Sequence, residues 1–135
     1  MNKKVILSAL GGGLTLFVVG GILFEFLLKD TMADMIKAMG SVYNPNPNFA
    51  IIALAQLILS LILAIFIYKS NVSTFVGGLT TGAWICFLII FWFDLWMLTT
   101  FNFMTVSMAL FDTISNTALG AVASGVIGWI QGKIN

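Results

Sequence analysis

The chain has 135 residues, of which 60% are hydrophobic and only 8% are charged, and its mean hydropathy is +1.08. Because soluble domains carry about 25% charged residues, this composition excludes an ordinary water-soluble domain and predicts an integral membrane protein embedded in a lipid bilayer. The six basic residues are all lysines and the net charge is only +1, so a nucleic-acid partner is not expected.

The residue types also limit the chemistry. Histidine is absent and Cys86 is the single cysteine, which excludes His-ligated zinc or haem, disulfides within the chain and dithiol redox pairs. The motifs of nucleotide-binding loops, serine hydrolases and zinc proteases are absent as well. We therefore expect no metal, no cofactor and no catalytic residue, and the chain is not expected to be an enzyme.

Hydropathy predicts four membrane-spanning helices. A helix needs about 20 mainly apolar residues to cross a hydrocarbon layer about 30 Å thick. Four stretches meet this requirement, at about residues 5–28, 49–68, 73–98 and 104–131. Thr99, Thr100 and Asn102 are expected to break the chain between the last two spans. The fold class predicted is all-α: a single transmembrane domain, residues 1–135, forming an integral membrane four-helix bundle.

The lysines predict an orientation. Cytoplasmic loops carry an excess of lysine and arginine. If both termini lie inside, only Lys29 and Lys37 are outside, and the other four lysines are inside: Lys3, Lys4, Lys69 and Lys133. This N-in, C-in topology is expected in a multi-pass protein of the cell membrane, in bacteria the inner membrane. The first span starts like a secretory signal but lacks a small-residue cleavage site, so we expect it to be retained.

The connection between the first two spans, residues 29–48, is predicted to lie outside. Met32, Met35, Ile36 and Met39 repeat at helical spacing, which predicts a short amphipathic interfacial helix at about residues 31–39. Asp30 or Thr31 is expected to cap its start and Gly40 its end; alternatively, the first span continues to Met39 with a bend. Prolines 45 and 47 then predict a stiff, non-helical loop.

Small residues predict how the helices associate. Within lipid, helices gain little from the hydrophobic effect, so they associate where small residues allow close approach. Such residues occur at helical spacing in every span, in the second as Ala53, Gln56, Ser60 and Ala64. The predicted packing residues are Gly13, Gly20, Gly21, Gly78, Gly82, Gly120, Ser124 and Gly128. A homo-oligomer, or a complex with another membrane protein, is expected if one glycine face remains uncovered.

Three carboxylates within the spans are the candidate functional groups. Glu25, Asp94 and Asp112 are costly in an apolar span unless each has a partner or a wet cavity. In the predicted topology all three belong to the outer half, where they would form an acidic vestibule and share protons. Asn116, Gln56 and Ser60 would continue this ion or ligand pathway inward.

The acids could instead stabilise the bundle or bind a ligand. Asp94 could bond Gln56, Asn102 or a backbone donor, and Asp112 could cap the buried part of the last helix, both serving assembly of the bundle. The acids could also line a pocket for a lipid headgroup or a small molecule. The sequence leaves these alternatives open.

The order of features resembles that of small four-span bacterial membrane proteins classed as domains of unknown function. The resemblance lies in a glycine-rich first span ending in Glu25, the outer segment MIKAMG at 35–40, GGLTTG at 77–82 and ALGA at 118–121. It implies a four-helix membrane fold and no particular chemistry. Small multidrug exporters and dual-topology fluoride channels are similar in length, but the position of Glu25, the orientation bias and the lack of arginine fit them less well.

We interpret the sequence as a proton- or cation-linked transporter or channel subunit with an acidic outer vestibule. The alternatives are a non-catalytic accessory or assembly protein that packs against another membrane protein, and a lipid- or small-molecule-binding protein. These hypotheses differ in what the three acids contact.

Overall fold

The structure, a computed structural model, describes residues 1–135 and contains helices and no strand. Four helices are long and apolar enough to cross a membrane, which confirms the predicted all-helical fold with four long apolar helices. They are α1 (Lys3–Ile22), α3 (Phe49–Lys69), α4 (Phe75–Thr100) and α5 (Val106–Lys133). Three short elements lie between α1 and α3: the π-helical turn η1 (Leu23–Leu27), the helix α2 (Lys29–Met39) and the 3-10 turn η2 (Gly40–Val42).

Polar caps fix where the long helices begin. The first backbone N–H groups of a helix have no partner within it, and an Asn or Thr side chain can accept from them. Asn2, Asn48, Thr74 and Thr105 do so at the starts of α1, α3, α4 and α5. As a result, α4 and α5 start and end about two residues later than predicted. Thr99 and Thr100 lie inside α4, because the Thr99 hydroxyl donates to carbonyls of its own helix.

The segment after α1 differs from the prediction at its start. α2 begins at Lys29, and neither Asp30 nor Thr31 caps it. The cap prediction was wrong because the chain arrives already helical: the amide of Leu28 donates to Leu23 O, and the amide of Met32 donates to Leu28 O. The alternative of a first span that runs on with a bend describes this region better. α2 does end at Gly40, whose φ is +58°, and residues 43–48 are not helical.

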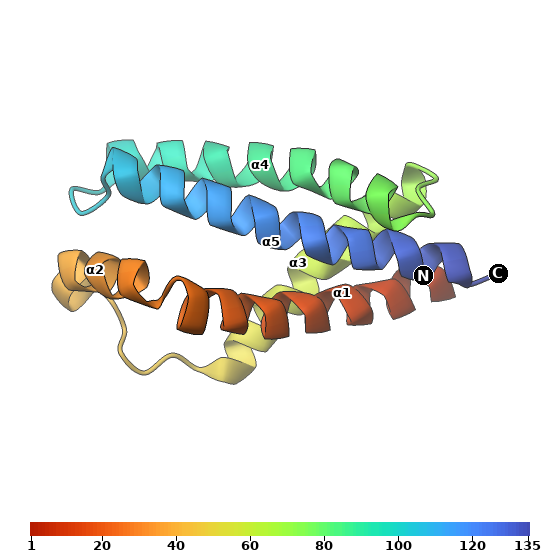
Figure 1. Cartoon of the computed structure of the whole chain (residues 1–135), viewed down its shortest axis with the longest axis horizontal. Coiled ribbons are helices and arrows are strands. Elements are labelled where there is room, and N and C mark those ends of the chain that lie inside the picture. Colours follow the sequence, from red (N-terminus) through yellow and green to blue (C-terminus); the bar gives the residue numbers. More distant parts are fainter.

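Helices α4 and α5 lie side by side and antiparallel (Figure 1). Their glycines allow this approach: a methyl group added at Gly78 would collide with the backbone carbonyl of Ser124. Gly82 likewise faces the Ser124 side chain, and Gly120 faces Cys86. Close backbone contact of this kind is the main source of helix association in lipid.

Helix α1 packs between α3 and α5. Gly12 contacts Ser60 and Ile127, Gly13 contacts Leu57 of α3, and Gly20 contacts Leu119 of α5. Helices α3 and α4 follow one another in sequence yet have little contact with each other. In contrast to the expectation for Gly21, this glycine has open space around it, because the glycines at 12, 13 and 20 already provide the close approaches of α1.

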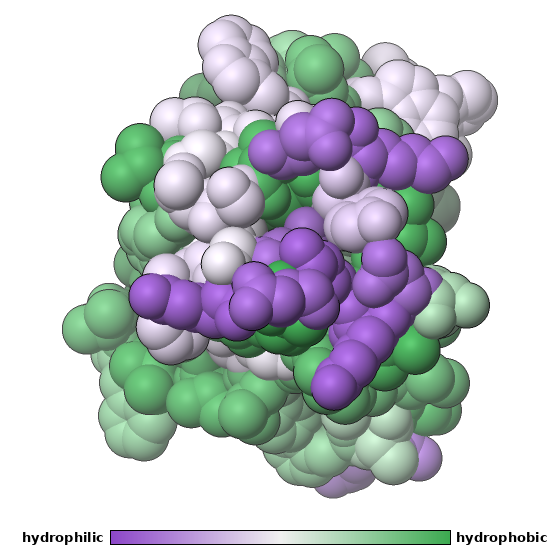
Figure 2. Space-filling model, turned by 90° about the vertical axis from the view of Figure 1, so that its right-hand side faces the viewer, coloured by the Kyte–Doolittle hydropathy of each residue, from purple (hydrophilic) through white to green (hydrophobic).

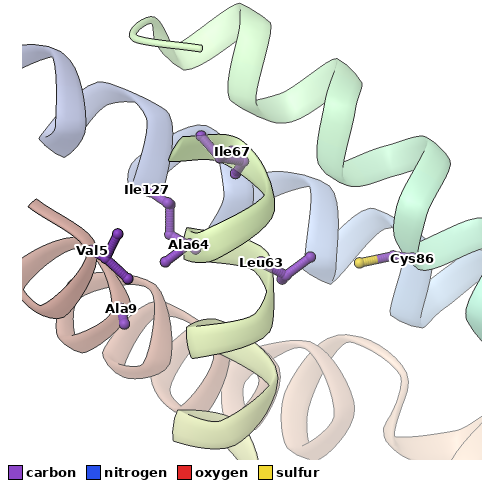
Figure 3. Packing of buried hydrophobic residues seen from close by; sticks show 7 residues of the cluster. All are labelled: Val5, Ala9, Leu63, Ala64, Ile67, Cys86 and Ile127. Atoms are coloured by element: carbon purple, nitrogen blue, oxygen red, sulfur yellow. The ribbon is translucent and has the colours of Figure 1, made fainter. Parts of the chain in front are cut away.

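The two ends of the bundle differ. The N- and C-termini and residues 70–74 lie at one end, which we call the terminal end; α2 and residues 101–105 lie at the other, the distal end (Figure 1). The terminal half holds a buried apolar cluster in which α1, α3, α4 and α5 meet (Figure 3). Its members are Val5, Ala9, Leu63, Ala64, Ile67, Cys86 and Ile127.

We expect Gly78→Ala to destabilise the fold by about 1–3 kcal/mol, since the added methyl forces α4 away from the α5 backbone. Gly21→Ala is the matched control: it also adds one methyl to a helical glycine, but nothing lies within 4 Å of it. The free energy of unfolding in detergent micelles measures both. Equal losses in the two variants would show that close α4–α5 packing is not what Gly78 provides.

Candidate functional site

Two of the three acids meet at the α4–α5 contact in the distal half. Asp94 of α4 is only 2% exposed, and its Oδ2 accepts a hydrogen bond of 2.6 Å from Thr113 Oγ1 of α5. Asp112 precedes Thr113 by one residue, and its carboxyl group lies close to that of Asp94. Because α4 and α5 are antiparallel and joined by a short loop, the two acids lie at the same level of the bundle. We call Asp94 and Asp112 the carboxyl pair.

Asp112 also bonds to its own helix. Asn116 Nδ2 donates to Asp112 Oδ1 at 2.9 Å and to the Asp112 backbone carbonyl at 3.2 Å. The one-turn spacing of the two residues on α5 makes this contact possible. Asp112 is therefore held between a hydrogen-bond donor from its own helix and a second carboxyl group from α4.

Asp112 and Asn116 line a pocket of about 310 Å³ bounded by α1, α3, α4 and α5. We call it the acid pocket. Gln56 of α3 is its third strongly polar residue, and most of the remaining wall is apolar, including Trp92 and Phe93. The pocket exists because α3 diverges from α4, leaving space between helices that are neighbours in sequence. Asp94 lies behind Asp112 and is not part of the wall.

Glu25 does not join the carboxyl pair. It lies on the π-helical turn η1, is exposed, and lines a separate pocket of about 280 Å³, the side pocket. The partition between the side pocket and the acid pocket is formed by residues that line both: Leu16, Gln56, Asn116 and Leu119. The single vestibule expected for all three acids is thus two adjoining pockets, with Gln56 and Asn116 facing both.

Ser60 does not extend a polar path toward the terminal end. It is fully buried, and its hydroxyl donates to the Ala9 carbonyl at 2.7 Å, which ties α3 to α1. Beyond it lies the apolar cluster of Figure 3, with Leu63, Ala64 and Ile127 completely buried. The acid pocket is therefore closed on the terminal side.

Gln131 makes polar contacts that the sequence pattern did not reveal. It lies in the last turn of α5 and is 3% exposed; its Nε2 donates to Ser8 Oγ of α1 at 3.0 Å and to the Ala64 carbonyl of α3 at 2.9 Å. Gln131 thus joins three helices at the closed side. A glutamine just inside the predicted end of a span was the available signal, but such a position is equally typical of an exposed interfacial residue.

No group of three or more His, Cys, Asp or Glu side chains is arranged to hold a metal ion. Comparison of the chain with protein-family models, with curated proteins and with solved structures finds no match. The function must therefore be inferred from the arrangement of the residues themselves.

We expect Thr113→Val to destabilise the protein by about 1–2 kcal/mol, since it leaves the buried Asp94 carboxyl without its hydroxyl donor. Thr80→Val is the matched control, because the exposed Thr80 hydroxyl bonds only carbonyls of its own helix. Unfolding free energies in micelles report the difference. A Thr113→Val variant as stable as Thr80→Val would mean that this hydrogen bond does not hold Asp94 in place.

Proposed function

We propose that this chain is a small multi-pass transporter that couples the movement of a cation to a proton held by Asp94 and Asp112. The observation that carries the proposal is the contact between the two carboxyl groups next to a pocket closed on one side. Two carboxylates in an apolar setting repel one another strongly unless they share a proton. A cation that enters the acid pocket offers a second way to neutralise the pair, so proton and cation compete for the same site.

The shape of the acid pocket favours a transporter over an open channel. A channel needs a continuous polar path. The Ser60 hydroxyl, however, already donates its hydrogen bond to the Ala9 carbonyl, and the apolar cluster of Figure 3 fills the terminal half of the bundle. A site closed toward one side of the membrane is what one state of an alternating-access transporter requires. In this proposal the distal end faces outward, with both termini and the closed side toward the cytoplasm of a bacterial inner membrane.

The wall of the acid pocket favours a lipophilic cation as the transported species. A small hydrated metal ion needs several oxygen ligands, and the pocket offers only Gln56, Asp112 and Asn116. Trp92 and Phe93 instead provide aromatic surface, which attracts organic cations through the ring faces. Its volume of about 310 Å³ lies at the lower end of the usual range for small-molecule sites, about 300–1,000 Å³.

A second candidate is a lipid- or small-molecule-binding protein that performs no transport, supported by the mainly apolar wall of the same pocket. The assembly hypothesis has less support. The glycines expected to face a partner are occupied by contacts within the chain, and Gly21 is the one within the long helices that meets no neighbour.

We expect Asp112→Asn and Asp94→Asn each to abolish proton-driven uptake of tetraphenylphosphonium into proteoliposomes. Asparagine has the size of aspartate but cannot take up and release the proton. Uptake is followed under an imposed pH gradient, with Asp34→Asn on the exposed helix α2 as the control for a lost acid. Circular dichroism verifies that each variant remains helical.

Three outcomes are distinguishable. Loss of uptake in the carboxyl-pair variants alone supports the transporter. Wild-type protein that binds tetraphenylphosphonium equally at low and high pH, without uptake, supports the binding protein and contradicts the transporter. Normal uptake by Asp112→Asn contradicts the role given to the carboxyl pair.

A further inference from the structure

The terminal end carries a polar pocket that the proposed transport does not use. Its volume is about 220 Å³, and it is lined by Lys4, Tyr68, Asn71, Val72, Ser73 and Gln131. All of these residues except Val72 have polar side chains. They come from the start of α1, the end of α3, the turn before α4 and the end of α5. We call this the terminal pocket.

The terminal end is positively charged throughout. Lys3 and Lys4 open α1, Lys69 ends α3 and Lys133 ends α5. All five acids belong to η1, α2 or the distal halves of α4 and α5. Glu25 is more than a full helix away from Lys4, about 30 Å at 1.5 Å per residue, which exceeds the screening length of about 8 Å in physiological salt. No Asp or Glu of the chain therefore neutralises these lysines.

Hydrophilic side chains gather across the middle of this end, with hydrophobic side chains around them (Figure 2). In a chain that spans a bilayer, such a surface lies at the level of the lipid headgroups. The half-buried Lys4 lines the terminal pocket, whereas the neighbouring Lys3 is exposed and does not. Of these two adjacent lysines of equal charge, only Lys4 is therefore part of the pocket.

Gln131, one of the residues that line the pocket, has an acceptor without a donor. Gln131 Nε2 is used by Ser8 and Ala64, while Gln131 Oε1 is buried and has no hydrogen-bond partner. A buried polar atom without a partner is unfavourable. A ligand that matches this pocket carries a negative charge for Lys4 and a hydrogen-bond donor for Gln131.

We propose that the terminal pocket binds the headgroup of an anionic phospholipid of the glycerol type. Lys4 pairs with the phosphodiester, and a headgroup hydroxyl donates to Gln131, with Asn71 and Ser73 adding hydrogen bonds. Lys3, Lys69 and Lys133 attract anionic lipid to this end in general, while Lys4 selects the bound one. This site is independent of the carboxyl pair and holds whether or not the chain is a transporter.

The test measures lipid binding to the delipidated full chain in micelles. Phosphatidylglycerol and phosphatidylcholine are titrated, and retained lipid is counted by native mass spectrometry. We expect wild-type protein to retain phosphatidylglycerol in preference to phosphatidylcholine. Lys4→Gln should weaken phosphatidylglycerol binding about fivefold or more, from about 1 kcal/mol per basic residue near a lipid surface. Lys3→Gln removes the same charge outside the pocket and should weaken phosphatidylglycerol binding clearly less than Lys4→Gln does.

A second variant separates binding from folding. Gln131→Glu keeps the size of the side chain but places a carboxylate beside the phosphodiester, so it should weaken phosphatidylglycerol binding more than phosphatidylcholine binding. Helicity and thermal stability without added lipid identify variants that merely unfold. If Gln131→Glu unfolds, the comparison of Lys4→Gln with Lys3→Gln alone decides whether the terminal pocket binds the lipid.

Each contrary outcome overturns a defined part of the proposal. Equal weakening by Lys3→Gln and Lys4→Gln leaves only diffuse attraction and removes the pocket as a site. Binding of inorganic phosphate or glycerol 3-phosphate that matches phosphatidylglycerol in affinity and in dependence on Lys4 identifies a soluble phosphate site instead of a lipid site. Equal binding of both lipids removes the selectivity for an anionic headgroup.

Discussion

The close approach of α4 and α5 through their glycines determines most of what is specific in this molecule. Gly78 and Gly82 face Ser124, and Gly120 faces Cys86, so the two helices meet almost backbone to backbone. In lipid this close packing replaces the hydrophobic drive that would join helices in water. It also brings Asp94 against Asp112 in the distal half. The acids are thus buried as a consequence of the same contact that holds the pair of helices together.

The rest of the bundle follows from what this contact leaves free. Helix α5 uses one side for α4 and another for α1, and α1 in turn holds α3 through Gly12 and Gly13. Helix α3 therefore has little contact with α4, although a short turn joins the two helices. Toward the terminal end the space between them is filled by the apolar cluster; in the distal half a space remains as the acid pocket. One packing constraint accounts for both the filled half and the pocket.

Length and hydropathy sufficed to predict the four long helices, because each must satisfy the backbone hydrogen bonds of about 20 residues within itself. The partners of the acids could not be predicted in the same way. The four-residue repeat from Asp112 to Gly128 forms one stripe in the sequence, yet each step turns about 40° on a helix of 3.6 residues per turn. The stripe nevertheless stays against α4, where Gly120 faces Cys86 and Gly128 faces Thr74, while Asp112 at its distal end also lines the acid pocket. Thr113, the partner of Asp94, is not a member of this stripe, so the repeat did not reveal it.

In the proposed transporter, a change of access would occur between two pairs of helices. Helices α4 and α5 form the most tightly packed pair; α1 and α3, joined by the Ser60 hydrogen bond to Ala9, form a second pair that packs on the first through α1. Between the two helix pairs on the closed side, Gln131 supplies the side-chain hydrogen bonds, to Ser8 and Ala64, and the apolar cluster supplies the remaining contact. Rocking of α1 and α3 against α4 and α5 would break these contacts and leave the carboxyl pair intact, because Asp94, Asp112 and Thr113 all belong to the α4–α5 helix pair. The acids would then be exposed to the other side without being separated, which is what a site that carries a proton across the membrane requires.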